Sequence, residues 1–216
     1  MPRFVSAWGV VLLATLGVSA CSSSSRSRGD DGSAVAPAPV TVDKGPTGKA
    51  ARTQVIGTAP PGAFIRLEPL FTHDFPRTAE GGFMDQSGQM FTPGAMVAQT
   101  GQAVTFRSSE DVLHNVRVIR AEDKAPIFNV ATPPWGAYTH TFDEAGTYDV
   151  TCDIHAAMRA TILVTATPYA RIADESGRFS FADVAPGAYT LIGFSGENEL
   201  RRRVEIAGNR IELTLP

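Results

Sequence analysis

From about residue 53 onward, apolar and polar residues alternate in short runs that are separated by Gly, Pro, Asn and Asp. A period of two residues is typical of a β-strand, because successive side chains point to opposite faces of a sheet. No long stretch repeats its apolar residues with the helical period of about 3.6 residues. The clearest runs are residues 104–106, 138–142, 148–150, 162–164, 178–181, 189–192, 204–206 and 211–215. The pattern predicts an all-β protein built from two small β-sandwich domains.

The composition agrees with such a protein and argues against a nucleic-acid partner. A chain of 216 residues is expected to form one or two domains, and 43% apolar residues are enough to build a core. Its 22 acidic and 19 basic residues give a net charge of −3. Binding to nucleic acid calls for clustered Lys and Arg. The one basic run, Arg201-Arg202-Arg203, is expected to lie on a solvated strand face.

The first residues have the pattern of a signal peptide. Arg3 precedes an apolar run, residues 4–18, which is too short and too lightly flanked for a membrane-spanning helix. The run ends in Val18-Ser19-Ala20-Cys21, which resembles the bacterial lipobox, where the signal is cleaved before a cysteine that receives a lipid. The alternative is an ordinary secretory signal cut near Ala20. Either pattern predicts that residues 1–20 are a signal peptide and that the protein is exported.

The lipobox resemblance implies an anchor and a location. Cys21 would carry the lipid that attaches the protein to a membrane, and Ser22 usually permits transfer to the outer membrane. The expected location is the periplasmic face of a bacterial membrane, the outer membrane rather than the inner one. Residues 21–52 contain almost no large apolar side chains and cannot bury enough surface to fold. They are expected to form a disordered, lipidated tether.

The second of the two cysteines needs an explanation of its own. If Cys21 carries a lipid, Cys152 has no partner for a disulfide. An unpaired thiol in an oxidising compartment is a liability unless something occupies it. Cys152 opens the stretch Cys152-Asp-Ile-His155-Ala-Ala-Met158, where a thiol, an imidazole and a thioether follow at steps of three. These three side chains are candidate metal ligands.

The flanking pattern places the three candidates in a loop between two strands and not on a helix. Cys152 shares its parity with the apolar residues upstream, so it ends a strand with its side chain pointing inward. Those residues are Phe142, Tyr148 and Val150. Residues 159–164 predict the next strand, which leaves residues 153–157 as a tight loop.

A loop this short covers only one side of a metal ion, so a further ligand must come from elsewhere. His114 is the candidate, because it has the inward parity of its apolar neighbours Val112, Val116 and Val118. A lone His on an apolar face and a lone Met are more often simple core residues. Together with an inward thiol that has no other role, they favour a shared site.

The donor types favour copper over the other common metals. Two imidazoles and a thiolate with a weak axial thioether define the blue-copper electron-transfer site. Zinc prefers four firm tetrahedral donors, and thioether is a poor one. Iron–sulfur clusters need more thiolates than this chain offers.

Residues 84–166 resemble a cupredoxin of the plastocyanin and amicyanin type, a Greek-key β-sandwich. The residues that carry the resemblance are Phe91-Thr-Pro93, Val97, Gly101, Val104, Phe106, His114-Asn115, Phe142, Gly146, Tyr148 and Cys152. The resemblance implies that one type 1 copper ion is bound by His114, Cys152, His155 and Met158. It also implies that Asn115 tethers the ligand loops by hydrogen bonds, and that redox partner proteins dock beside His155, at Ala156 and Ala157.

Two departures from the family pattern stand close to the ligands. Ala156 occupies the position after the second histidine, where the family often has proline. Ser108-Ser109-Glu110-Asp111 replaces the usual Asn-x-Asp ahead of the first histidine. Neither departure removes a ligand.

The function implied by the resemblance is electron transfer by copper cycling between Cu(II) and Cu(I), with redox partner proteins in the periplasm. No substrate pocket or nucleophile is needed, so we expect neither an enzyme nor a small-molecule substrate. Two alternatives remain open: a copper-holding protein without a redox partner, and a metal-free adhesion or scaffold module.

The last residues resemble a carboxypeptidase-regulatory-like (transthyretin-like) domain, a family that is usually structural. Residues 172–181 and 184–191 carry this resemblance. The tail from residue 168 has about four expected strands and lacks the opening hairpin of that family, while residues 54–67 read as such a hairpin. A tail of this length buries too little surface to be comfortably stable alone. The expected arrangement is a small β-sandwich split between residues 53–72 and 167–216, with the cupredoxin-like segment inserted in one of its loops.

Overall fold

The computed structural model describes residues 52–215 except 79, 197 and 209. The expected signal peptide, the lipidation of Cys21 and all but the last residue of the expected tether lie outside the described residues. Within the described part, the ordered elements are β-strands, as the alternating pattern predicts. None of these residues forms a helix long and apolar enough to cross a bilayer.

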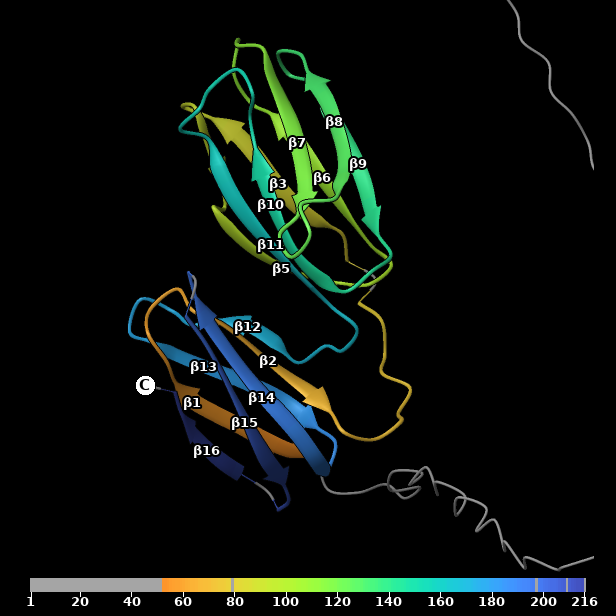
Figure 1. The fold of residues 1–216 in the computed structure, drawn as a ribbon, viewed down its shortest axis with the longest axis vertical. Coiled ribbons are helices and arrows are strands. Elements are labelled where there is room, and N and C mark those ends of the chain that lie inside the picture. The colour runs from red at the N-terminus through yellow and green to blue at the C-terminus, as the bar shows by residue number, and fades with distance from the viewer. Residues whose placement is uncertain (1–51, 79, 197, 209, 216) are drawn as a thin grey trace, which may run out of the picture. The chain divides into compact units, whose positions relative to one another are not determined.

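The middle of the chain forms two sheets that we call the central sandwich, residues 82–165 (Figure 1). One sheet has the order β5-β11-β10-β7-β8 and the other the order β4-β3-β6-β9. The strands are β3 (Gly82–Ser87), β4 (Met90–Thr92), β5 (Ala95–Gln99), β6 (Gln102–Ser108), β7 (His114–Arg120), β8 (Pro126–Thr132), β9 (Ala137–Phe142), β10 (Gly146–Thr151) and β11 (Arg159–Thr165).

The core of the central sandwich follows from the alternation in the sequence. In β6, the buried Val104 and Phe106 alternate with the more exposed Thr105 and Arg107. The same alternation buries Tyr148 and Val150 in β10 and continues to Cys152, which is 3% exposed. Because strands of both sheets contribute to one buried cluster, the apolar side chains lie between the sheets.

One side chain of this sandwich is placed differently from the sequence-based expectation. The sequence predicts His140, which stands between Thr139 and Thr141, on the polar and exposed face of its strand, but in the structure it lies half-buried on the same face of β9 as Tyr138 and Phe142. Its ring centroid is 4.7 Å from that of Phe128 and 4.8 Å from that of Phe142. Desolvation lowers the pKa of His140 below its ordinary value. Thr139, His140 and Thr141 are all polar, so this part of β9 shows no alternation that would mark its inner face.

The remaining strands form a second pair of sheets, which we call the split sandwich because they come from both sides of the central segment. Their orders are β13-β1-β16 and β12-β2-β14-β15. In Figure 1 the orange β1 lies beside the blue β13 and β16. The strands are β1 (Thr53–Thr58), β2 (Phe64–Pro69), β12 (Ala170–Ile172), β13 (Arg178–Val184), β14 (Gly187–Ser195), β15 (Asn198–Ile206) and β16 (Arg210–Thr214).

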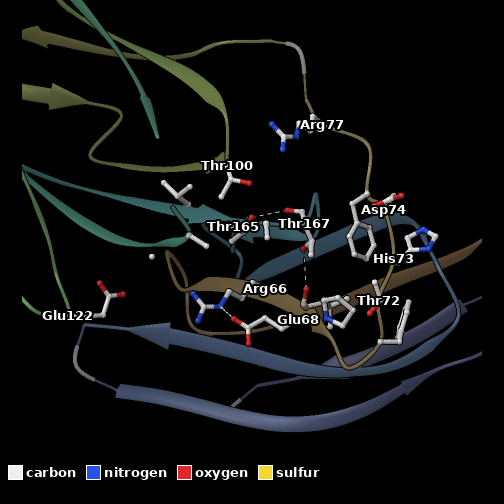
Figure 2. A pocket seen from close by; sticks show the side chains of 18 residues that line it. Arg66, Glu68, Thr72, His73, Asp74, Arg77, Thr100, Glu122, Thr165 and Thr167 are labelled. Atoms are coloured by element: carbon white, nitrogen blue, oxygen red, sulfur yellow. Dashed lines mark hydrogen bonds and ion pairs between the residues drawn. The ribbon is translucent and has the colours of Figure 1, made fainter. Parts of the chain in front are cut away.

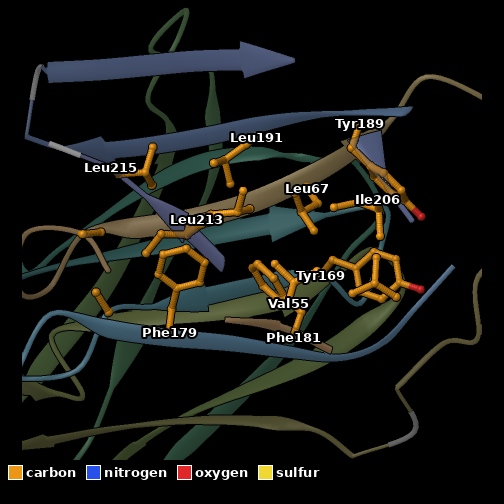
Figure 3. Close-up of a cluster of buried hydrophobic side chains, with 14 of the residues drawn as sticks. Val55, Leu67, Tyr169, Phe179, Phe181, Tyr189, Leu191, Ile206, Leu213 and Leu215 are labelled. Carbon is orange, nitrogen blue, oxygen red and sulfur yellow. The ribbon is translucent and has the colours of Figure 1, made fainter. Parts of the chain in front are cut away.

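The pairing of β1 and β2 is with strands that follow Pro168 in the sequence. β1 pairs antiparallel with β13 and parallel with β16, and β2 pairs antiparallel with β12 and β14. The buried side chains of these strands form one cluster (Figure 3), which contains Val55, Leu67, Tyr169, Phe179, Phe181, Tyr189, Leu191, Ile206, Leu213 and Leu215. The tail contributes one strand more than expected, because the three-residue β12 is too short to show an alternating pattern.

Candidate metal centre

The loop from Cys152 to Met158 is closed by its own backbone. The N–H of Met158 donates to the carbonyl of His155 at 2.9 Å, and the N–H of Cys152 donates to the carbonyl of Met158 at 3.3 Å. These bonds turn the chain back between β10 and β11. Cys152 and Met158 are buried, His155 is half-buried, and Ala156 and Ala157 are exposed.

Three of the four predicted ligands form one cluster. The ligand atoms of His114, Cys152 and His155 all lie within 4.8 Å of one another. The Nδ1 atoms of the two histidines are 3.1 Å apart, and Cys152 Sγ is 3.7 Å from His155 Nδ1. His114 is the first residue of β7 and is fully buried, so a strand of the sheet fixes it opposite the loop.

The contact between His114 and Glu110 indicates which ring nitrogen of His114 is available to a metal. His114 Nε2 is 2.7 Å from Glu110 Oε1. An ionised carboxylate only accepts, so Nε2 is the donor, and the Nδ1 atom of the neutral ring carries a lone pair. That lone pair faces Nδ1 of His155 and the sulfur of Cys152. Two imidazole nitrogens and a sulfur gathered at one point fit a transition metal that takes N and S ligands.

Met158, the fourth predicted ligand, is buried at the end of the same loop. It is 1% exposed and belongs to the same buried cluster as Cys152. It directly precedes β11, so its backbone is fixed by the strand that pairs with β10. A thioether among apolar side chains is a weak ligand for copper and a poor one for zinc.

Asn115 joins the strand that carries His114 to the loop that carries Cys152 and His155. Its Oδ1 accepts from the N–H of Asp153 at 2.7 Å. Its Nδ2 donates to Asn129 Oδ1 at 2.7 Å and to Asp153 Oδ2 at 3.1 Å. Asn115 is 7% exposed, so these bonds satisfy a buried amide as well as connect the two segments.

Glu110 is the residue of the site whose contact the sequence did not reveal. In the sequence it belongs to the segment that replaces the usual Asn-x-Asp ahead of the first histidine, and in the structure its carboxylate contacts the ring of His114. The backbone N–H of Gly88, and after it the His114 ring and the N–H of Gln89, lower the pKa of Glu110 against the effect of partial burial. The spacing of four residues between Glu110 and His114 is the only signal the sequence carried.

The surface next to the cluster carries exposed apolar side chains. Leu113 and Ile154, which precede the two histidines, are each about half exposed. Trp135 is 69% exposed, in the loop that follows Thr132, the strand partner of His114. From the sequence alone Trp135, which follows two prolines, could lie in the core or border the metal site, and its exposure excludes the core.

A pocket away from this cluster is lined by residues of mixed charge (Figure 2). It contains the ion pair between Arg66 and Glu68 and the hydrogen bond from Thr165 Oγ1 to the carbonyl of Thr167. His73 and Asp74 also line it. None of the three clustered residues contributes to it, so we assign it no part in metal binding.

Comparison with known proteins agrees with this description of the central sandwich. Residues 82–165 match the family model described as copper binding proteins, plastocyanin/azurin family. No curated protein matches the chain at a significant level. The match and the cluster of His114, Cys152 and His155 support a copper-binding cupredoxin domain in this segment.

Solved structures that are similar to parts of the chain include two amicyanin mutants and a purple cupredoxin. A Cu(I) amicyanin mutant is 26% identical, with 40% of this chain and 84% of that chain covered and a TM-score of 0.36. An oxidized amicyanin mutant is 27% identical over the same shares, with a TM-score of 0.37. The purple cupredoxin from Nitrosopumilus maritimus is 20% identical, with 38% of this chain and 98% of that chain covered and a TM-score of 0.34.

Proposed function

We propose that this protein is a type 1 (blue) copper protein that carries single electrons between partner proteins. The observation that carries the proposal is the cluster of His114, Cys152 and His155, whose ligand atoms lie within 4.8 Å of one another. Of the metals considered, copper suits two imidazoles and one thiolate beside a buried thioether best. The family match of residues 82–165 supports the same metal.

Four residues would hold the copper. His114 and His155 would bind it through their Nδ1 atoms and Cys152 through its sulfur, and the thioether of Met158 would be a weaker fourth ligand. Copper in such a site supplies a one-electron couple between Cu(II) and Cu(I). The protein contributes a cluster held on two sides, by β7 and by the closed loop, and Asn115 bonds these sides together. A site fixed in this way needs little rearrangement when its charge changes.

The exposed surface beside His155 is the proposed docking site for redox partners. His155 is half-buried, and Ala156 and Ala157 beside it are exposed. Small apolar residues form a shallow contact that suits brief and weak encounters. Electron transfer needs no bound substrate, so the proposal includes neither catalysis nor a small-molecule ligand.

The proposed location is the periplasmic face of a bacterial membrane, the outer membrane rather than the inner one. Its support is the sequence Val18-Ser19-Ala20-Cys21, in which Cys21 would carry the lipid anchor. The segment before the described strands would then act as a tether to the membrane.

We also propose that the split sandwich is a transthyretin-like domain into which the copper domain is inserted. The support is the pairing of β1 and β2 with strands after Pro168. Two connections, one on each side of the central segment, would hold the copper domain more firmly than a single tether.

Copper loading of the purified chain tests the metal assignment. Adding Cu(II) is expected to produce one intense visible band from charge transfer between the thiolate and copper. Cys152→Ser removes the thiolate and is expected to abolish the band, whereas Ser22→Ala, far from the site in sequence, leaves it unchanged. Stoichiometric copper in a colourless wild-type protein would contradict the assignment.

A further inference from the structure

Among the residues that the structure describes, Glu110 is the charged residue that contacts a clustered histidine on the side of the ring away from the cluster. Glu110 lies in the loop between β6 and β7, four residues before His114. Its Oε1 is 2.7 Å from Nε2 of His114, whose side chain is fully buried. The Glu110 side chain is 22% exposed. Such a carboxylate–histidine contact fixes both the orientation of the ring and the position of its proton.

The carboxylate is itself held in place by the turn between β3 and β4. The N–H of Gly88 donates to Glu110 Oε2 at 3.0 Å, and the N–H of Gln89 donates to Oε1 at 3.4 Å. Both turn residues have positive φ, 60° for Gly88 and 56° for Gln89. Successive N–H groups in a turn can form a concave site for an anion. The turn therefore positions the negative charge before any metal binds.

This arrangement has two consequences for a bound metal. The bond to Glu110 keeps the proton of His114 on Nε2, so Nδ1 is free to bind a metal without first losing a proton. The negative charge also lies one imidazole ring away from the metal. A nearby negative charge stabilises the more positive of two oxidation states.

We propose that Glu110 is a positioning residue that holds His114 in the Nε2–H tautomer and lowers the reduction potential of the copper site. Only the effect on the reduction potential rests on the proposed function. The tautomer is a property of the chain and is measurable without copper. The β3–β4 turn contributes to this positioning, because two of its N–H groups donate hydrogen bonds to the carboxylate of Glu110.

The tautomer is tested first, in the metal-free full chain. Nitrogen-15 NMR of the histidine rings is expected to show His114 with its proton on Nε2 in the wild type. Glu110→Gln keeps an acceptor oxygen and is expected to retain a majority of this tautomer, while Glu110→Ala gives a mixture. Circular dichroism confirms that the variants are folded. A tautomer ratio that is the same in Glu110→Ala and in the wild type would overturn the positioning role.

The reduction potential is tested in the copper-loaded full chain, with Asp111→Asn as the matched control. Both Glu110→Gln and Asp111→Asn remove one negative charge, but Asp111 is exposed and its charge is screened by solvent. Glu110→Gln is expected to raise the potential more than Asp111→Asn does. Glu110→Ala is expected to weaken copper binding by about tenfold or more. Equal shifts in Glu110→Gln and Asp111→Asn would overturn the electrostatic role.

The two experiments separate this inference from the proposed function. If the protein binds no copper but His114 shows the Glu110-dependent tautomer, the proposed function fails and the positioning role stands. If copper binds with the expected colour but Glu110 affects neither tautomer nor potential, the proposed function stands and the present inference fails.

Discussion

Met158 is the residue whose role depends most on the nature of the metal. It is buried with Cys152 in one apolar cluster, and its backbone closes the loop by accepting from the N–H of Cys152. Packing alone would account for its burial. A weak axial bond to copper would add an effect on the reduction potential, which packing does not have.

Met158→Leu separates these roles. Leucine fills a similar volume without the sulfur, so the fold is expected to lose less than about 1.5 kcal/mol. The variant is expected to bind copper and keep its colour while its reduction potential rises, because the axial ligand tunes the potential more than it holds the metal. Absorption spectra and redox titration measure both. Complete loss of copper from Met158→Leu would show that the thioether is a main ligand.

At this scale the sequence predicted which side chains face inward but not all of their contacts. The two-residue period of the neighbouring apolar residues predicted that the side chains of Cys152 and His114 point inward. The contact of Glu110 with His114 depends on the course of a loop and on the turn at Gly88, which no period encodes. The exposure of Trp135 depends on its loop in the same way.

At the scale of single elements, the turn between β12 and β13 shows how one carboxylate organises a connection. Asp174 Oδ1 accepts from the N–H of Ser176 at 2.9 Å, from its hydroxyl at 2.6 Å and from the N–H of Arg178 at 2.9 Å. These bonds, the Ser176 hydroxyl first, lower the pKa of Asp174. Gly177 completes the turn with φ of +76°, where an added Cβ would lie 2.4 Å from the carbonyl oxygen of Ala59.

The stability of the protein is therefore expected to depend on the charge of Asp174. A carboxyl group with a lowered pKa stabilises the fold above its unfolded pKa of about 3.9 and loses this contribution as pH falls through the folded value. Asp174→Ala is expected to lower the free energy of unfolding at neutral pH. The difference from the wild type is expected to shrink as the pH falls below about 4. Urea unfolding at several pH values measures it.

Glu175→Ala is the matched control for this prediction. Glu175 is the exposed neighbour of Asp174, so its removal is expected to change stability little at any pH. If Asp174→Ala lost as much stability at low pH as at neutral pH, the ionised carboxylate would not be what stabilises the turn.

The elements that the sequence predicted best are those whose alternation is long. Runs such as residues 104–106 and 189–192 fall within the observed β6 and β14. The three-residue β12 is not among the alternating runs, because a two-residue period needs more positions to be recognised. The prediction for His140 in β9 was wrong, because this residue and the threonines on either side of it are all polar and show no alternation.

At the scale of the whole molecule, the order of strands in the sequence differs from their order in the sheets. β2 pairs with β12 and β14, although the whole central segment separates them along the chain. The sequence indicated this pairing because residues 54–67 read as the opening hairpin of a domain whose other strands follow only after residue 168. Strand partners so far apart form through tertiary packing, so the alternating pattern alone does not determine them.

The central claim is that the molecule carries electrons, and not only that it holds copper. Voltammetry of the copper-loaded full chain on an electrode tests it most directly, with Cys152→Ser as the control. The account predicts one reversible one-electron wave that remains over many cycles, and no such wave for Cys152→Ser. A wild-type chain that binds one copper ion but gives no reversible wave would contradict electron transfer and leave a copper-holding protein in its place.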